Sequence, residues 1–193
     1  EDMVRPYQRC VVPDRISGTI LNSRNPHLVK NKSGKTVHLP DRAEKINDQC
    51  NPLHYVTKND NRAHTYCLAK LAATIHEQTD GKPARRLAEI YDAVFIDEIQ
   101  DLVGWDFAVI RAMVETSISE FDCVGDFRQS VYQTSETTKK PQASMEKLAE
   151  FKDMGFEIDN LAISWRCIQS ICDLAHRLHA NDGHYAPTKS QVD

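Results

Sequence analysis

The sequence of 193 residues contains no long uninterrupted apolar run. None of its apolar stretches approaches the roughly 18 to 20 residues that a helix needs to cross a bilayer. The first residues, EDMVRP, also lack the apolar core of a secretory signal peptide. We therefore expect a cytoplasmic protein that makes no use of a membrane.

Paired cysteines and an excess of positive charge are missing too. The six cysteines are scattered and form no CxxC pair, so reduced structural thiols are favoured over disulfides or a zinc site. The formal net charge is -4, which gives no overall attraction to nucleic acid. Any binding to nucleic acid would depend on a local basic patch.

One such patch lies in residues 15–45, where seven basic residues stand against two acidic ones. A stretch of this kind can follow a phosphate backbone, and it can equally be the solvated face of a loop. Residues 1–60 as a whole are rich in Pro, Asn and Asp, which predicts an irregular segment with one or two short strands.

The chain has no convincing phosphate-binding loop. Residues 33–36, SGKT, match the end of the pattern G-x-x-x-x-G-K-[ST], but Val29 occupies the position of the leading glycine. The preceding residues do not form a buried strand, and the following residues do not open a helix whose N-terminus could hold phosphate. We expect no phosphate loop here.

The remainder predicts an α/β fold, because strand and helix patterns alternate. We expect helices over residues 61–78, over 84–90, for about a dozen residues from Trp105, over 144–154 and over 167–179. We expect strands over residues 93–96, 121–124 and 156–163, and a linker or frayed end over 181–193.

The most informative stretch is AVFIDEIQD, residues 93–101, in which four apolar residues lead directly into an acidic pair. A parallel strand buried on both faces can carry charge only where it emerges at its carboxyl end, which is the usual ligand crevice of an open sheet. We predict that Asp97 and Glu98 are Mg²⁺ ligands and that Glu98 also activates the attacking water in phosphoryl transfer.

Polar residues also follow the other two predicted strands, and we expect all three strand ends to share one crevice. Gln129 is a neutral amide that can bridge the γ-phosphate and the water, and Arg166 supplies fixed positive charge to the transition state. Trp165 offers a flat face for a nucleotide base.

Three further residues near these strand ends are assigned less narrowly. Gln100 is a candidate nucleotide contact together with Trp165. Gln100 and Asp101 can alternatively support the acidic pair or cap the helix that follows. Arg128 contacts either phosphate or solvent.

Three sequence motifs carry a resemblance to a known family. Residues 97–101, DEIQD, resemble the D-E-x-Q-D Walker B signature of the UvrD/Rep-like superfamily-1 DNA helicases. Residues 125–132, GDFRQSVY, are similar to their third motif, G-D-x-x-Q-S-I-Y, and residues 161–167, LAISWRC, resemble the fourth, L-x-x-N-Y-R-S. The resemblance covers residues 85–180, with the three motifs in the family's order.

The resemblance implies a RecA-like P-loop NTPase-type sheet that couples ATP hydrolysis, with Mg²⁺, to movement along single-stranded DNA. It implies that Asp97 and Glu98 serve as metal ligand and catalytic base, that Gln129 and Arg166 contact the γ-phosphate, and that Trp165 stacks on adenine. It divides the chain into an inserted accessory region (1–83), the later part of a RecA-like domain (84–180) and a linker (181–193).

Some features of the family are absent from the sequence. The W-R-G-A-like tail that usually follows the third motif is not recognisable after Tyr132, and neither the phosphate loop nor the family's later motifs are present. We therefore expect a piece of a longer helicase, used in DNA repair or phage defence. The alternative is a non-catalytic helicase-like module that binds DNA or a nuclease partner.

Overall fold

A computed structural model of the chain describes residues 16, 18–20, 28–30, 32–38, 51–57, 62–116, 118–129, 137–179 and 186–192. The chain divides into two compact units, residues 1–150 and residues 151–193. Each unit is described by itself below.

The N-terminal part of the first unit contains short strands, as the sequence predicts. Strands β2 (Leu28–Lys30) and β3 (Thr36–His38) form an antiparallel hairpin, and β1 (Gly18–Ile20) pairs in parallel with β4 (Arg62–His64). Residues 33–36 therefore lie in the turn and first residue of a hairpin strand, which is not the strand-to-helix context of a phosphate loop.

The helix predicted over residues 61–78 begins later than expected. Strand β4 and the 3₁₀ turn η3 (Thr65–Cys67) come first, and helix α1 runs over Leu68–Gln78. The reason is that β4 pairs on both sides, with β1 and with residues 55–57. The His64 N–H donates to the Tyr55 carbonyl at 2.9 Å, and the Thr57 N–H donates to the Arg62 carbonyl at 2.8 Å. These bonds satisfy backbone groups that a helix would otherwise pair.

A hydrophobic core forms where β4 and the 3₁₀ turn η2 (Pro52–His54) meet α1. Its buried members come from the two sides of this junction: Tyr55, Val56, Ala63, Cys67 and Leu71. Burial raises the pKa of the Cys67 thiol to about 11, which keeps it in the neutral thiol form expected of a structural cysteine.

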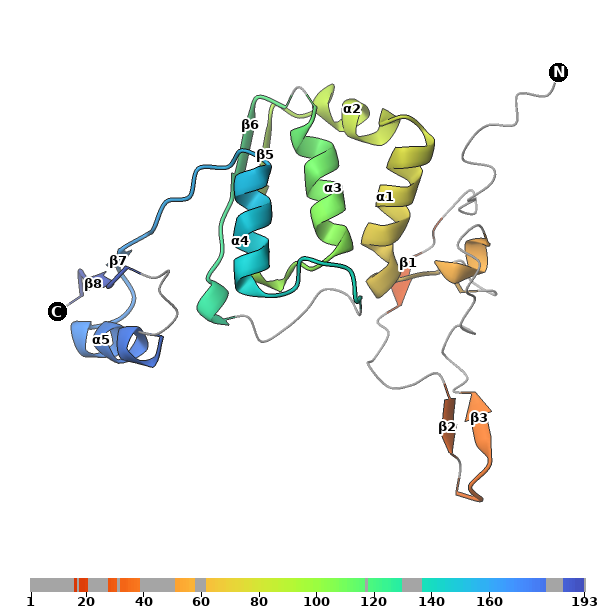
Figure 1. The fold of residues 1–193 in the computed structure, drawn as a ribbon, viewed down its shortest axis with the longest axis horizontal. Helices are drawn as coiled ribbons and strands as arrows, with labels where there is room; N and C mark the ends of the chain where they lie inside the picture. The colour runs from red at the N-terminus through yellow and green to blue at the C-terminus, as the bar shows by residue number, and fades with distance from the viewer. Residues whose placement is uncertain are drawn as a thin grey trace. The chain divides into compact units, whose positions relative to one another are not determined.

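The second half of the first unit has the predicted α/β rhythm (Figure 1). Helix α2 (Lys82–Ala88) leads into strand β5 (Ala93–Ile96), helix α3 (Trp105–Val114) follows, and strand β6 (Glu120–Cys123) pairs with β5 in parallel, from Ala93 opposite Glu120 to Ile96 opposite Cys123. Helix α3 runs beside α1 and buries Phe107, Ile110 and Ala112. The 3₁₀ turns η4 (Ile99–Asp101) and η5 (Phe127–Gln129) follow the two strands.

One expectation about β5 is wrong for the part of the chain that the structure describes. The apolar run was expected to be buried on both faces, but the Phe95 side chain is 67% exposed while its neighbours are partly covered. The two-stranded sheet is thus packed on one face only.

Helix α4 (Ser144–Asp153) agrees with the prediction, and Gly155, with φ of 90°, follows its end. The strand predicted over residues 156–163 is largely wrong: only Ile163–Ser164 (β7) is a strand. Polar residues 157, 159 and 160 interrupt the apolar positions, and Ile158 and Leu161 are exposed rather than buried.

Strand β7 has a partner within the second unit, and the expected crevice shared by all three strand ends stays a prediction. Strand β7 pairs in parallel with β8 (Lys189–Ser190), a strand that the sequence analysis missed, and helix α5 (Gln169–Leu178) connects them. The Gln169 side chain accepts the Ser190 N–H at 2.8 Å and donates to the Thr188 carbonyl at 3.2 Å, so it holds β8 in place.

The described residues form a mixed helix and strand structure with short parallel strand pairs, as expected for the α/β class. Within those residues, no helix is both long and apolar enough to span a membrane. The division into residues 1–83, 84–180 and 181–193 stays a prediction.

Candidate functional site

The acidic pair lies in a bulge at the carboxyl end of β5. The Val124 N–H donates to the Ile96 carbonyl at 2.8 Å, and the Val124 carbonyl accepts the N–H of Ile99 at 3.1 Å. A regular parallel ladder would use the N–H of residue 98 for the second bond, so the chain holds one extra residue at this point. The bulge leaves Asp97 and Glu98 exposed at the edge of the sheet, beyond the last ladder bond.

The backbone of the bulge is unusual at Glu98. Its φ of 54° and ψ of 39° place a non-glycine residue in the left-handed region, which costs about 1 kcal/mol or more. The Glu98 N–H, which a regular ladder would use, donates instead to Oδ1 of the Asp97 carboxylate at 2.8 Å. The Glu98 carboxylate meets the side chain of Gln100, a residue of the η4 turn, from this backbone position.

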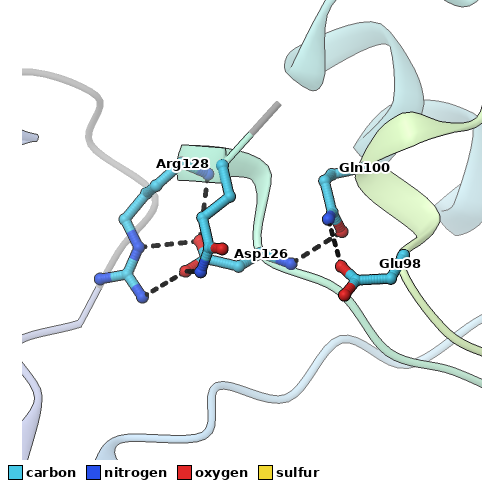
Figure 2. A network of polar contacts seen from close by, with 5 residues as sticks. Glu98, Gln100, Asp126 and Arg128 are labelled. Atoms are coloured by element: carbon cyan, nitrogen blue, oxygen red, sulfur yellow. Dashed lines mark hydrogen bonds and ion pairs between the residues drawn. The ribbon is translucent and has the colours of Figure 1, made fainter. Parts of the chain in front are cut away.

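Gln100 connects the two strand ends (Figure 2). Its side chain is only 3% exposed; Nε2 donates to the Glu98 carboxylate at 2.5 Å, and Oε1 accepts the backbone N–H of Asp126 at 3.1 Å. Both ends of the amide are therefore engaged within the protein. The side chain fixes Glu98, which follows β5, relative to Asp126, which follows β6.

Gly125 allows this close approach. A Cβ atom at position 125 would lie 2.5 Å from Oε1 of Gln100 and 2.7 Å from Cγ1 of Ile99, too close for any side chain. Gly125 does not adopt the left-handed conformation, so the requirement for glycine is one of space rather than of backbone angle.

Asp126 gathers the polar groups of the η5 turn. Arg128 forms a bidentate ion pair with it, Nε to Oδ1 at 2.8 Å and one terminal nitrogen to Oδ2 at 2.9 Å, and Nε2 of Gln129 donates to Oδ2 at 3.0 Å. Burial alone would raise the pKa of Asp126, but these hydrogen bonds and the charge of Arg128 outweigh it and lower the pKa. Asp126 is therefore a firmly ionised anchor.

These contacts bear on two alternatives that the sequence leaves open. The Arg128 guanidinium pairs with Asp126, and a contact between Arg128 and phosphate stays a prediction. Capping of α3 is not the role of Gln100 or Asp101: the N-cap position is Gly104, and the Asp106 carboxylate accepts the Val103 N–H at 2.9 Å.

The fit of this edge to Mg²⁺ can be judged from its donors. The described residues contain no group of three or more His, Cys, Asp or Glu side chains that could hold a metal on their own. Mg²⁺ in nucleotide sites usually takes only one or two protein carboxylates and completes its shell with water and phosphate oxygens. The exposed pair Asp97 and Glu98 fits that requirement and does not fit a site made of protein ligands alone.

Trp165 and Arg166 lie in the second unit, directly after β7. Trp165 is 77% exposed, and the Ser164 hydroxyl accepts the N–H of Arg166 at 3.3 Å and that of Cys167 at 3.0 Å. The structure brings Glu98, Gln100, Asp126 and Gln129 together within the first unit. The nucleotide-binding roles of Trp165 and Arg166 stay predictions.

The sequence suggests Gln100 as one possible support for the acidic pair, but it does not reveal the bond from Gln100 to the Asp126 N–H or the Asp126–Arg128 pair. Both have a local signal, since Gln100 stands two residues after Glu98 and Arg128 two residues after Asp126, but neither spacing alone says which atoms meet. A cavity of about 490 Å³ lies elsewhere, between the C-terminal ends of α1 and α3, and is lined by residues such as His76, Arg85 and Glu115. It contains none of the predicted site residues.

No protein-family model and no curated protein matches this chain.

Proposed function

We propose that this chain is part of an ATP-dependent DNA helicase or translocase of the UvrD/Rep-like superfamily-1 type, with a RecA-like sheet that hydrolyses ATP to move along single-stranded DNA. The observation that carries the proposal is the Gln100 side chain, which joins the Glu98 carboxylate to the Asp126 N–H. It links the Walker B-like motif to the G-D-x-x-Q motif, at the carboxyl ends of two parallel strands.

Each residue of this edge has a chemical role in the proposed reaction. Glu98, exposed and held by Gln100, accepts a proton from the attacking water as general base. Asp97 and Glu98 would hold Mg²⁺, whose charge offsets that of the phosphates. Gln129, exposed at the end of η5, would contact the γ-phosphate once its amide leaves Asp126.

Of the two roles that the sequence offers for Gln100, this scheme uses the support of the acidic pair rather than a nucleotide contact, because the Gln100 amide is buried and engaged at both ends. Arg166 would supply positive charge to the transition state and Trp165 a stacking face for adenine. Single-stranded or partly duplex DNA is the proposed polymer partner.

The test is ATP hydrolysis by the intact gene product that contains these residues. Glu98→Gln removes the base while preserving size, and we expect it to lower turnover by about two to four orders of magnitude. The matched control is Glu120→Gln, an exposed glutamate at the amino end of β6, which should leave turnover unchanged. Normal turnover in Glu98→Gln would remove Glu98 from the reaction.

A second candidate is a non-catalytic helicase-like module that binds DNA or a nuclease partner. It is favoured by one observation, the hairpin context of residues 33–36, since the best match to a phosphate loop in this sequence is not one. For the 193 residues alone we expect negligible ATP hydrolysis. An intact protein that binds single-stranded DNA but hydrolyses no ATP would establish the module in place of the enzyme.

A further inference from the structure

A buried lysine lies beneath the candidate site and has no part in the proposed chemistry. Lys147 of α4 is fully buried, and its Nζ donates to the backbone carbonyl of Gln100 at 2.5 Å. Burying an ammonium group is costly unless hydrogen bonds and opposite charges compensate. An apolar side chain would fill the same volume without that cost, so the lysine calls for a specific explanation.

The surroundings of Lys147 supply part of that compensation, although the pKa of Lys147 is still lowered on balance. Burial lowers its pKa, while the nearby carboxylates Asp101, in the η4 turn, and Asp106, in α3, act in the opposite direction and favour the charged form. The ammonium group thus lies near two carboxylates and bonds to a carbonyl of the η4 turn, which follows the acidic pair. It is not an isolated charge in an apolar core.

Helix α4 is itself fixed independently of Lys147. At its start the Glu146 carboxylate accepts the N–H of Gln142 at 3.0 Å, and one turn on, Glu150 forms an ion pair with Arg111 of α3 at 2.9 Å. Lys147 therefore extends from an anchored helix to the η4 turn. A hydrogen bond from an anchored donor restrains its acceptor, here the peptide unit that carries the Gln100 side chain.

We propose that Lys147 is a positioning residue: its hydrogen bond to the Gln100 carbonyl fixes the η4 turn, so that the Gln100 amide holds the Glu98 carboxylate and the Asp126 N–H in one arrangement. The consequence for catalysis, through Glu98, rests on the proposed function. The positioning itself does not, because it concerns only contacts within the protein.

The Asp126 amide reports on this arrangement, since its N–H donates to Oε1 of Gln100. We would measure amide hydrogen exchange by NMR in the 193-residue chain for the wild type, for Lys147→Met, and for Lys152→Met, an exposed lysine of the same helix, as control. The Val124 amide, bonded to the Ile96 carbonyl, is the internal reference for the sheet.

In Lys147→Met we expect the Asp126 amide to exchange at least about tenfold faster than in the wild type, with the exchange rate of the Val124 amide unchanged. In Lys152→Met we expect neither exchange rate to change. An unchanged Asp126 amide, or equal acceleration at Asp126 and Val124, overturns the proposal, because the first shows no coupling and the second only a general loss of stability.

If Lys147→Met does not fold, the test is made with Lys147→Arg, which keeps the positive charge and the hydrogen-bond donors. Folding of the arginine variant, with Asp126 exchange within about threefold of the wild type, supports the proposal, because a larger cation is then accepted where an apolar side chain of similar length is not. Failure of both variants to fold, or equal acceleration at both amides, indicates packing alone and overturns it. Absence of ATP hydrolysis in the intact wild-type protein would refute the proposed function and leave this result standing.

Discussion

Two turns of this chain place a glycine among residues typical of nucleotide sites, and the structure treats them differently. At residues 33–36 the glycine lies in a hairpin turn, where a Cβ on Gly34 would meet no atom of the described residues within 4 Å. At residues 125–129 the glycine is pressed against Ile99 and Gln100 and opens a network that joins two strands. The function of a short motif depends on what packs against it, and within the part of the chain that the structure describes the second turn has such packing while the first has none.

The two turns should differ most in how much stability is lost when each glycine is replaced by alanine. Gly125→Ala should destabilise the protein by about 1 to 3 kcal/mol, because its Cβ would displace the buried Gln100 amide and press on Ile99. Gly34→Ala should cost about 1 kcal/mol, from the left-handed φ of 75° alone. Urea unfolding measures both.

Asparagine separates the two causes. Gly34→Asn should recover part of the loss seen with alanine, since asparagine tolerates the left-handed region, whereas Gly125→Asn should be at least as harmful as Gly125→Ala. Similar losses for alanine at both positions, both relieved by asparagine, would contradict the distinction between a requirement for space and one for conformation.

A smaller effect is expected at Glu98, a residue that combines a strained backbone with a proposed catalytic role. Glu98→Gly should stabilise the protein relative to Glu98→Ala by about 1 kcal/mol, because both lose the carboxylate but only alanine keeps the strain of a positive φ. Thermal or urea unfolding of the pair measures the difference. Equal stabilities would show that the left-handed backbone at this position carries no strain.

The sequence was sufficient for the elements whose signal is local. The apolar pattern of α3, the acidic pair after β5 and the Gly125-Asp126 ending after β6 were all read correctly, because burial on one face and polarity at a strand end are properties of neighbouring residues. Phe156, Ile158 and Leu161 predict one strand over residues 156–163. The structure differs because Ile158 and Leu161 are exposed and do not face a core.

Local sequence patterns do not predict contacts between residues that are distant in the chain. Strand β8 is held by Gln169, some twenty positions earlier, and the Gln100 carbonyl in the η4 turn accepts a hydrogen bond from Lys147, 47 positions later. Nothing in the local pattern around Lys147 distinguishes it from the exposed Lys152 on the same helix. Side-chain to backbone bonds of this kind depend on how elements pack, and a single sequence does not encode them in any periodic form.

The smallest effect is expected at Lys35, the residue that would contact phosphate if residues 33–36 were a phosphate loop. Lys35→Ala should change stability by less than about 0.5 kcal/mol, as for most exposed positions, and should leave ATP affinity unchanged. Titration of a fluorescent ATP analogue into the intact protein and its variant measures the affinity.

In a true phosphate loop the lysine reaches the β- and γ-phosphates from a loop at a helix N-terminus, and loss of that lysine greatly weakens nucleotide binding. Residues 36–38 instead form a strand, so no helix N-terminus follows this turn to hold a phosphate. A tenfold loss of affinity in Lys35→Ala would therefore reverse the comparison and make the open turn the nucleotide site.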